Sequence, residues 1–180
     1  MSILTLDDFP GCPEVIEDSQ TFEANAVKKA VAVARYTGQM ALADDSGLEV
    51  DALGGAPGVF SARYAGDEAD DRRNLAKLLD DMRFVRDEER RAKFVCCIAL
   101  ASPDGAARTF GGAVEGTLGR EPRGSRGFGY DPIFYPMGET RTFGEMGEEE
   151  KDAISHRGKA LRAVRRYLTG GRERPPVQGE

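Results

Sequence analysis

Two adjacent carboxylates stand in the segment Asp44-Asp45-Ser46-Gly47, directly after a short apolar stretch over residues 40 to 43. We interpret that stretch as a strand that ends at the acids, where Gly47 lets the chain turn. Polar groups at strand ends in α/β sheets face the ligand crevice. Carboxylates there can hold Mg²⁺, which prefers oxygen ligands and bridges to substrate phosphates, and one of them can activate a water molecule. The alternative is an Asp-rich turn, because Asp, Ser and Gly are typical turn residues.

A second segment, Gly127 to Pro132, places two aromatic residues and one acid between flexible glycines. Phe128 or Tyr130 can stack on a purine, and Asp131 can accept hydrogen bonds from base N–H groups. The alternative is a turn whose aromatic rings belong to the core.

The segment from Lys151 to Arg157 gathers two cations and the chain's single histidine, His156. If Ser155 caps a final helix, the free N–H groups and the positive dipole end of that helix favour an anion beside them. The alternatives are a structural histidine and a solvated helix start. In combination, clustered acids, an aromatic cleft and a cationic helix start are three parts of a metal-dependent nucleotide site.

The hydrophobic pattern predicts the elements that position these segments. Thr21 caps a helix over residues 22 to 37, and Gly38 ends it. Further on, the pattern predicts a helix over residues 69 to 82, strands over residues 92 to 101, 108 to 118 and 133 to 135, and a helix from about residue 155 with Leu161, Val164 and Leu168 on one side. The charged run over residues 87 to 91 is interpreted as a solvated connection. The fold class is α/β, with a mixed sheet in a single domain over residues 1–170 and a flexible tail over residues 171–180.

Composition narrows the choice of partners. The 180 residues fit one domain, and the net charge of −6 argues against a nucleic-acid backbone as the main partner. No apolar run approaches the roughly 20 residues needed to span a bilayer, and the N-terminus lacks the pattern of a signal peptide. The three cysteines are interpreted as buried thiols of a reduced, cytoplasmic protein.

Four segments resemble the signature blocks of the inosine triphosphate pyrophosphatase family. They are TFEANAVKKA, ADDSGLEVDALGGAPGVFSARYAG, GFGYDPIF and EKDAISHRGKAL, in the family's order over residues 14 to 168. The resemblance implies an elongated α/β fold with a mixed sheet flanked by helices, and a homodimer. It also implies Mg²⁺-dependent hydrolysis of noncanonical purine nucleoside triphosphates (ITP, dITP and XTP) to the monophosphate and pyrophosphate, which removes them from the nucleotide pool.

The same resemblance assigns roles to individual residues. Asp45 matches the catalytic and metal-binding acid, and Glu17 is the best candidate for a second metal ligand, although Ile16 stands where many relatives have another acid. The remaining matches are to substrate-binding residues: Ser46, the base-recognition block Phe128, Gly129, Tyr130 and Asp131, the nucleotide-holding residues Lys151, His156 and Arg157, and Lys29 near the phosphates.

The start of the chain departs from the family pattern. Relatives open with a strand and a TGNxxK loop that binds the triphosphate, and the residues ahead of Glu14 contain no such loop. We therefore expect that the first strand and helix, about 30 residues by usual element lengths, are missing from this chain, most simply through a start codon assigned too late. A chain extended upstream is expected to be more stable and more active.

Two competing functions stay open at this level. The first is a nucleotide-binding protein of the same fold with little or no turnover, because the triphosphate-binding loop is missing. The second is a structural or interaction protein that keeps the fold for dimerisation, for which the sequence offers no positive feature.

Overall fold

The computed structural model describes residues 3–68 and 70–170. The predicted tail over residues 171–180 lies outside the described residues, as does Ala69, the predicted first residue of a helix. The helices and strands are α1 (Phe22–Thr37), β1 (Ala41–Val50), α2 (Asp71–Asp81), β2 (Arg91–Ala101), β3 (Ala107–Leu118), β4 (Phe134–Pro136), α3 (Glu148–Ile154) and α4 (His156–Leu168).

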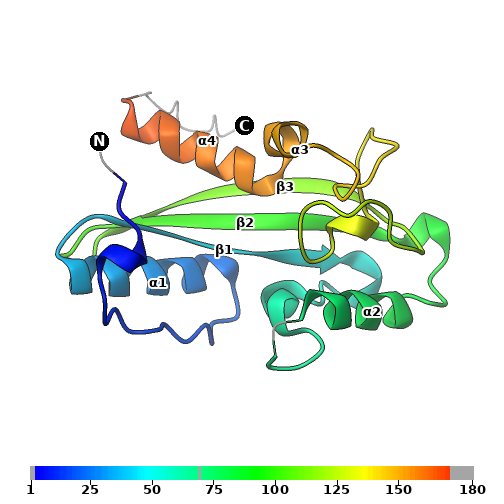
Figure 1. The fold of residues 1–180 in the computed structure, drawn as a ribbon, viewed down its shortest axis with the longest axis horizontal. Coiled ribbons are helices and arrows are strands. Elements are labelled where there is room, and N and C mark those ends of the chain that lie inside the picture. Colours follow the sequence, from blue (N-terminus) through cyan, green and yellow to red (C-terminus); the bar gives the residue numbers. More distant parts are fainter. Residues whose placement is uncertain (1–2, 69, 171–180) are drawn as a thin grey trace, which may run out of the picture.

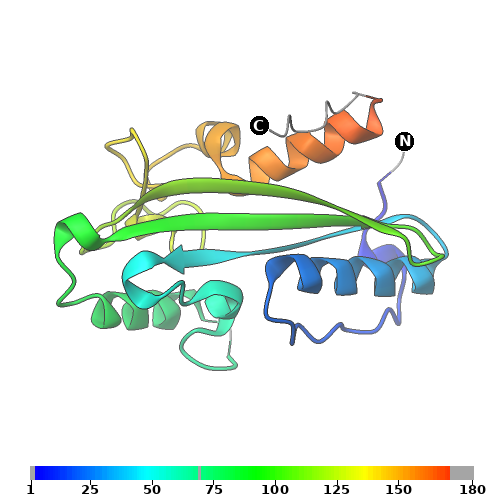
Figure 2. The same ribbon diagram turned by 180° about the vertical axis from the view of Figure 1, so that it is seen from behind.

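The strands form one sheet in the order β1-β2-β3-β4, and each neighbouring pair is antiparallel. The predicted α/β class is confirmed, but the parallel pair of a mixed sheet is not present among the described strands. Strands β2 and β3 form a hairpin through the predicted turn at residues 103 to 105, whereas longer segments connect β1 to β2 and β3 to β4. Figures 1 and 2 show β1, β2 and β3 along the long axis, with α1 and α2 below them and α3 and α4 above.

Helix α1 forms where the sequence predicts it. The hydroxyl of Thr21 accepts a hydrogen bond from the Ala24 N–H at 3.1 Å, and Gly38 ends the helix at φ 68°. Its buried stripe consists of small side chains, Ala26, Ala30 and Ala34 among them. Small side chains bring the helix backbone close to the sheet, and α1 packs there against β1 and β2.

Strand β1 corrects the interpretation of the paired acids. It runs without interruption from Ala41 to Val50, so Asp44 and Asp45 lie in mid-strand and not at a strand end. Gly47 does not turn the chain: a Cβ there would lie 2.5 Å from the Gly58 carbonyl oxygen, so the glycine permits close approach of another segment. Because strand side chains alternate, Asp44 and Asp45 point to opposite faces of the sheet.

The two faces have separate cores. Alanines of α1 pack on one face against Cys97, whereas the neighbouring Cys96 packs on the other with Ala160 and Val164 of α4. Leu161 and Leu168, predicted on the inner side of the last helix, are 46% and 39% exposed. Val164, the third residue predicted on that side, is buried as expected, and His156 and Ala160 are buried with it.

The prediction that residues 87 to 91 form a solvated connection is wrong for Arg90. Its side chain is 3% exposed and donates hydrogen bonds to the carbonyls of Met82, Leu118 and Gly119 at 2.7 to 2.9 Å. These carbonyls lie at the end of α2 and the end of β3, so the guanidinium joins two elements. Among residues 3–68 and 70–170, no helix has both the length and the apolar composition to cross a membrane.

Candidate active site

The α1 face of β1 presents Asp45, which is 7% exposed. Asn25 of α1 donates a hydrogen bond from its side-chain nitrogen to Asp45 Oδ2 at 3.0 Å. Asn25 is itself fixed, because its side-chain oxygen accepts the Ser19 N–H at 3.0 Å. One helical turn further along α1, Lys29 lies on the same side of the helix, so both side chains reach the same carboxylate.

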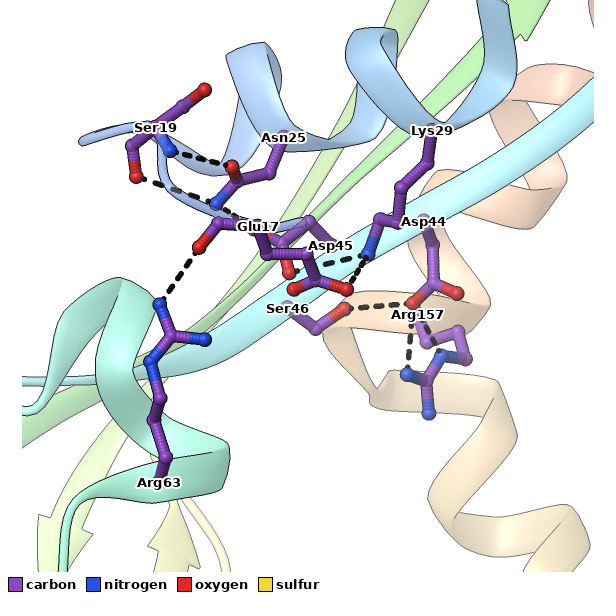
Figure 3. Close-up of polar contacts among 9 residues, drawn as sticks. All are labelled: Glu17, Ser19, Asn25, Lys29, Asp44, Asp45, Ser46, Arg63 and Arg157. Atoms are coloured by element: carbon purple, nitrogen blue, oxygen red, sulfur yellow. Dashed lines mark hydrogen bonds and ion pairs between the residues drawn. The ribbon is translucent and has the colours of Figure 1, made fainter. Parts of the chain in front are cut away.

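Lys29 is shared by two acids (Figure 3). Its Nζ lies 2.8 Å from Glu17 Oε1 and 3.6 Å from Asp45 Oδ1. The segment that carries Glu17 precedes α1 and is held from the other side, where Arg63 donates to the Glu17 carbonyl at 2.7 Å. Glu17, Lys29 and Asp45 are therefore brought together on the α1 face of β1.

The electrostatics of this group favour an added cation. Burial raises the pKa of Asp45; the Asn25 hydrogen bond and the Lys29 charge oppose this rise, and the nearby Glu17 carboxylate adds to it. Two carboxylates that share one lysine leave a net negative charge, and their oxygens suit a hard cation. The described residues contain no group of three or more His, Cys, Asp or Glu side chains placed to hold a metal. Mg²⁺ needs no such group, because it is commonly held by one or two carboxylates with substrate phosphates and water.

The opposite face of β1 presents Asp44 and Ser46. Arg157, in the first turn of α4, donates to Asp44 Oδ2 from Nε at 3.2 Å and from Nη2 at 2.8 Å. The Ser46 hydroxyl donates to the same oxygen at 3.0 Å. Ser46 thus lies beside Arg157 and on the other side of the strand from Lys29.

The predicted base-recognition segment forms a loop next to Arg157. The Phe128 ring is 57% exposed, with Lys151 Nζ 4.8 Å and the Arg157 guanidinium carbon 5.6 Å from its centroid. Asp131, only 2% exposed, accepts the Phe128 N–H at 2.9 Å and Lys151 Nζ at 2.5 Å. Both contacts fall on Oδ2, so a base-facing role for Asp131 depends on Oδ1.

The other two members of this segment hold it in place. Tyr130 is 4% exposed, and its hydroxyl donates to the Ser61 carbonyl at 2.9 Å. Its ring lies in the main core, so Phe128 is the aromatic residue that is available for stacking. The Gly129 N–H donates to Asp71 Oδ2 at 2.8 Å, a contact that the sequence did not indicate.

His156 begins α4 and is 5% exposed. Its ring stacks on Phe94 with centroids 4.8 Å apart, and its Nδ1 has no hydrogen-bond partner among the described residues. Burial lowers the pKa of His156 to about 3, and the charges of Arg157 and Lys151 add to that effect. The imidazole is therefore neutral at neutral pH. Ser155 caps the helix as predicted, accepting the Gly158 N–H at 3.0 Å.

The predicted site residues thus fall into two groups joined by β1, one around Asp45 and one around Phe128. Sequence reasoning missed the contacts of Asn25 and Asp44, which hold the members in place. For Asn25 a signal existed, since it stands four positions before Lys29 and therefore on the same face of the helix.

Comparison with known proteins places this geometry in a family. The sequence profile of the Ham1 family matches residues 1–167. The dITP/XTP pyrophosphatase of Desulforamulus reducens is 52% identical over 166 residues, which cover 92% of this chain and 83% of that protein. The dITP/XTP pyrophosphatase of Geobacter sulfurreducens is 53% identical over 167 residues, which cover 93% of this chain and 84% of that protein.

Solved structures agree. The Staphylococcus aureus Ham1 protein is 39% identical and superposes with a TM-score of 0.88, covering 95% of this chain and 88% of that one. A Ham1 protein from Coxiella burnetii is 47% identical, with a TM-score of 0.84, and the match covers 88% of this chain and 82% of that one.

Proposed function

The chain belongs to the Ham1 family, and we propose that it is a nucleoside-triphosphate pyrophosphatase that hydrolyses noncanonical purine nucleotides (ITP, dITP and XTP) to the monophosphate and pyrophosphate. Relatives about 50% identical over most of the chain bear the name dITP/XTP pyrophosphatase. The observation that carries the proposal here is the buried acid Asp45, which faces Lys29 and Glu17 on one side of β1 while an exposed aromatic ring lies near its other side.

At the phosphate end, Asp45 serves as the base that takes a proton from the attacking water. The Asn25 hydrogen bond fixes Oδ2 and leaves Oδ1 on the side of Lys29. Lys29 supplies positive charge to the phosphates as the anhydride bond between the α and β phosphates breaks.

Mg²⁺ is the proposed cofactor, with Asp45 and Glu17 as its protein ligands. When bound, it would neutralise phosphate charge and polarise the reacting phosphoryl oxygens. Glu17, Asp45 and Lys29 carry a net charge of one negative unit, so an anionic triphosphate needs an added cation here. The test is a melting curve with and without MgCl₂, since a ligand that binds only the folded state raises the melting temperature. We expect a rise for the wild-type chain that is absent in Asp45→Asn; an equal rise in both would remove Asp45 from the metal site.

At the base end, Phe128 stacks on the purine, and the donors of His156 and Arg157 recognise the 6-oxo group. ATP carries an amine at that position, which would leave a donor unpaired, and such mismatches discriminate strongly. Lys151 and Asp131 keep the Phe128 loop in place.

The deciding experiment is pyrophosphate release from dITP, XTP and dATP at saturating Mg²⁺. We expect dITP and XTP to be hydrolysed and dATP to be spared, and His156→Ala and Arg157→Ala to lower the ratio of ITP to ATP turnover. Thr109→Ala is a control, because Thr109 lies on β3 and contacts Glu23, away from both groups. Equal losses with both nucleotides would remove His156 and Arg157 from base recognition. Nucleotide binding without any turnover would instead favour the binding protein that the sequence left open.

We further propose a cytoplasmic homodimer that acts on free nucleotides, without nucleic-acid or membrane partners. The net charge of −6 supports the absence of a polyanionic partner. Light scattering coupled to gel filtration tests the dimer, and a monomer mass at micromolar concentration would contradict it.

A further inference from the structure

Asp44 has no part in the function proposed above, yet it makes the densest set of polar contacts on its face of β1. Three donors converge on its Oδ2: Nε and Nη2 of Arg157, and the hydroxyl of Ser46. Strand alternation directs this carboxylate away from the group that contains Lys29 and Glu17. Asp44 is therefore not placed to bind the metal ion or to transfer a proton at the phosphate end.

Building on the proposed function, we propose that Asp44 is a positioning residue for the purine base: it fixes the Arg157 guanidinium beside the Phe128 ring. One strand then serves both ends of the nucleotide, with Asp45 directed to the phosphates and Asp44 to the base end. Figure 3 shows the two acids as neighbours on β1, with Lys29 and Arg157 reaching them from different helices.

The contacts leave part of Arg157 free for a ligand. Nε and Nη2 are bonded to Asp44, and no hydrogen bond joins Nη1 to a described residue. The guanidinium carbon stands 5.6 Å from the Phe128 centroid, so the guanidinium that carries this remaining donor lies beside the ring on which a base would stack. A planar guanidinium held at two of its nitrogens has a defined direction for its remaining donors.

The second cation beside Phe128 is held in the same way. Lys151 is tied to Asp131, as Arg157 is tied to Asp44. Each cation that flanks the exposed ring thus has its own acid. This pairing cancels the charge at the base end, which suits a neutral purine recognised by stacking and hydrogen bonds.

The ion pair between Asp44 and Arg157 is partly exposed to solvent. The side chains of Arg157 and Asp44 are each more than a third exposed, and ion pairs exposed to that degree contribute little to stability. Its value therefore lies in the orientation of Arg157.

The test compares Asp44→Asn and Asp44→Ala with wild type, using steady-state ITP hydrolysis and calorimetric binding of IMP. A freed arginine regains rotamer entropy that binding must remove, so we expect the KM for ITP and the Kd for IMP to rise about 10- to 30-fold. The kcat should stay within about threefold, because Asp45 is untouched.

A double-mutant cycle asks whether Asp44 acts through Arg157. Asp44→Asn should have no further effect on the KM in an Arg157→Ala background, whereas independent roles would add. The matched control is Glu49→Gln, which breaks the ion pair of the same strand with Lys93 (2.9 Å) away from the site. Glu49→Gln should leave the KM unchanged and shift the melting temperature about as much as Asp44→Asn.

Three results would overturn the inference: a loss of kcat at constant KM, additive effects of Asp44→Asn and Arg157→Ala, or an unchanged KM. Failure of the proposed function is recognised separately, because the wild-type chain would then hydrolyse no ITP. In that case IMP binding still tests Asp44, since it requires no turnover.

Discussion

The two faces of β1 carry the two halves of the candidate site, and they differ in how their charges are balanced. On the α1 face, Glu17 and Asp45 share the single cation Lys29. On the opposite face, each acid has a cation of its own: Asp44 with Arg157, and Asp131 with Lys151. The first half is short of positive charge before any phosphate arrives, and the second is already neutral. One half is therefore suited to a metal and phosphates, and the other to an uncharged base.

Asp45→Asn should have the largest effect, because the amide keeps the shape of the side chain but loses its charge and its basicity. We expect turnover of ITP to fall by roughly 10²–10⁴-fold or more. The loss should be equal for ITP and ATP, since the base half is unchanged. Near-wild-type turnover at saturating Mg²⁺ would contradict the role of Asp45, and a changed ITP/ATP ratio would show that the two halves are not separable.

His156 gives the base half a pH dependence of stability. In the unfolded chain a histidine takes up a proton near pH 6.5, whereas the folded pKa is about 3. Between these values the unfolded state binds more protons, so the free energy of unfolding falls as the pH falls. From pH 7.5 to pH 5 the loss should be about 2 kcal/mol relative to His156→Phe, measured by urea unfolding.

The single histidine makes this prediction easy to check by NMR. Nδ1 is buried without a partner, and a lone pair is tolerated there better than an N–H, so the proton should reside on Nε2. The ¹⁵N shifts should show this neutral tautomer from pH 5 to pH 8. An imidazole that titrates near pH 6.5 would contradict both the shift in pKa and the stability loss.

Gly111 and Gly112, neighbours on β3, test how tightly α4 packs against the sheet. A Cβ on Gly112 would lie 2.1 Å from the His156 carbonyl oxygen and 2.7 Å from the Ala160 nitrogen. A Cβ on Gly111, which points to the other face, would meet nothing within 4 Å. We expect Gly112→Ala to destabilise the protein by about 1–3 kcal/mol or more, and Gly111→Ala to change stability by less than about 0.5 kcal/mol. Equal melting temperatures for the two variants would mean that α4 can move away from β3 at little cost.

The sequence predicts most reliably what is encoded locally. Helix α1 combines a capping Thr21, a left-handed Gly38 and a stripe of small residues, and it forms over the predicted residues. The prediction of a turn at Gly47 was wrong because the need for a glycine there comes from distant residues: Gly58 and Ser61 pack where a side chain at position 47 would be. The prediction that Arg90 is solvated was wrong for the same reason, since the carbonyls that accept its hydrogen bonds come from other segments of the chain.

The candidate site shows the same division. Motifs identified its members, but not which of them would meet. Asn25 contacts Asp45 across 20 positions, and Arg157 contacts Asp44 across 113. Alternation of strand side chains separates the two acids, and that rule applies only once Asp44 and Asp45 are known to lie within a strand and not in a turn.

Helices α1 and α4 both contribute residues to the site, and each begins with a capping hydroxyl, so the effects of removing the two caps can be compared directly. On the α1 side, the Thr21 hydroxyl accepts the Ala24 N–H at 3.1 Å. On the α4 side, the Ser155 hydroxyl accepts the Gly158 N–H at 3.0 Å. Removal of either cap should cost about 1 kcal/mol in the free energy of unfolding.

The two cap variants should differ in specificity even though they agree in stability. Thr21 precedes the turn of α1 that carries Asn25, so Thr21→Ala should lower turnover of ITP and ATP slightly and by the same factor. Ser155 is 2% exposed and directly precedes His156 and Arg157. Without the cap, the first turn of α4 no longer holds these two side chains in place, so Ser155→Ala should lower the ratio of ITP to ATP turnover by a few-fold. Unfolding in urea and parallel assays with both nucleotides measure the two effects on the same preparations. If Ser155→Ala leaves the ratio unchanged at the expected loss of stability, the first turn of α4 does not set the choice of base, and recognition would have to be sought in the Phe128 loop.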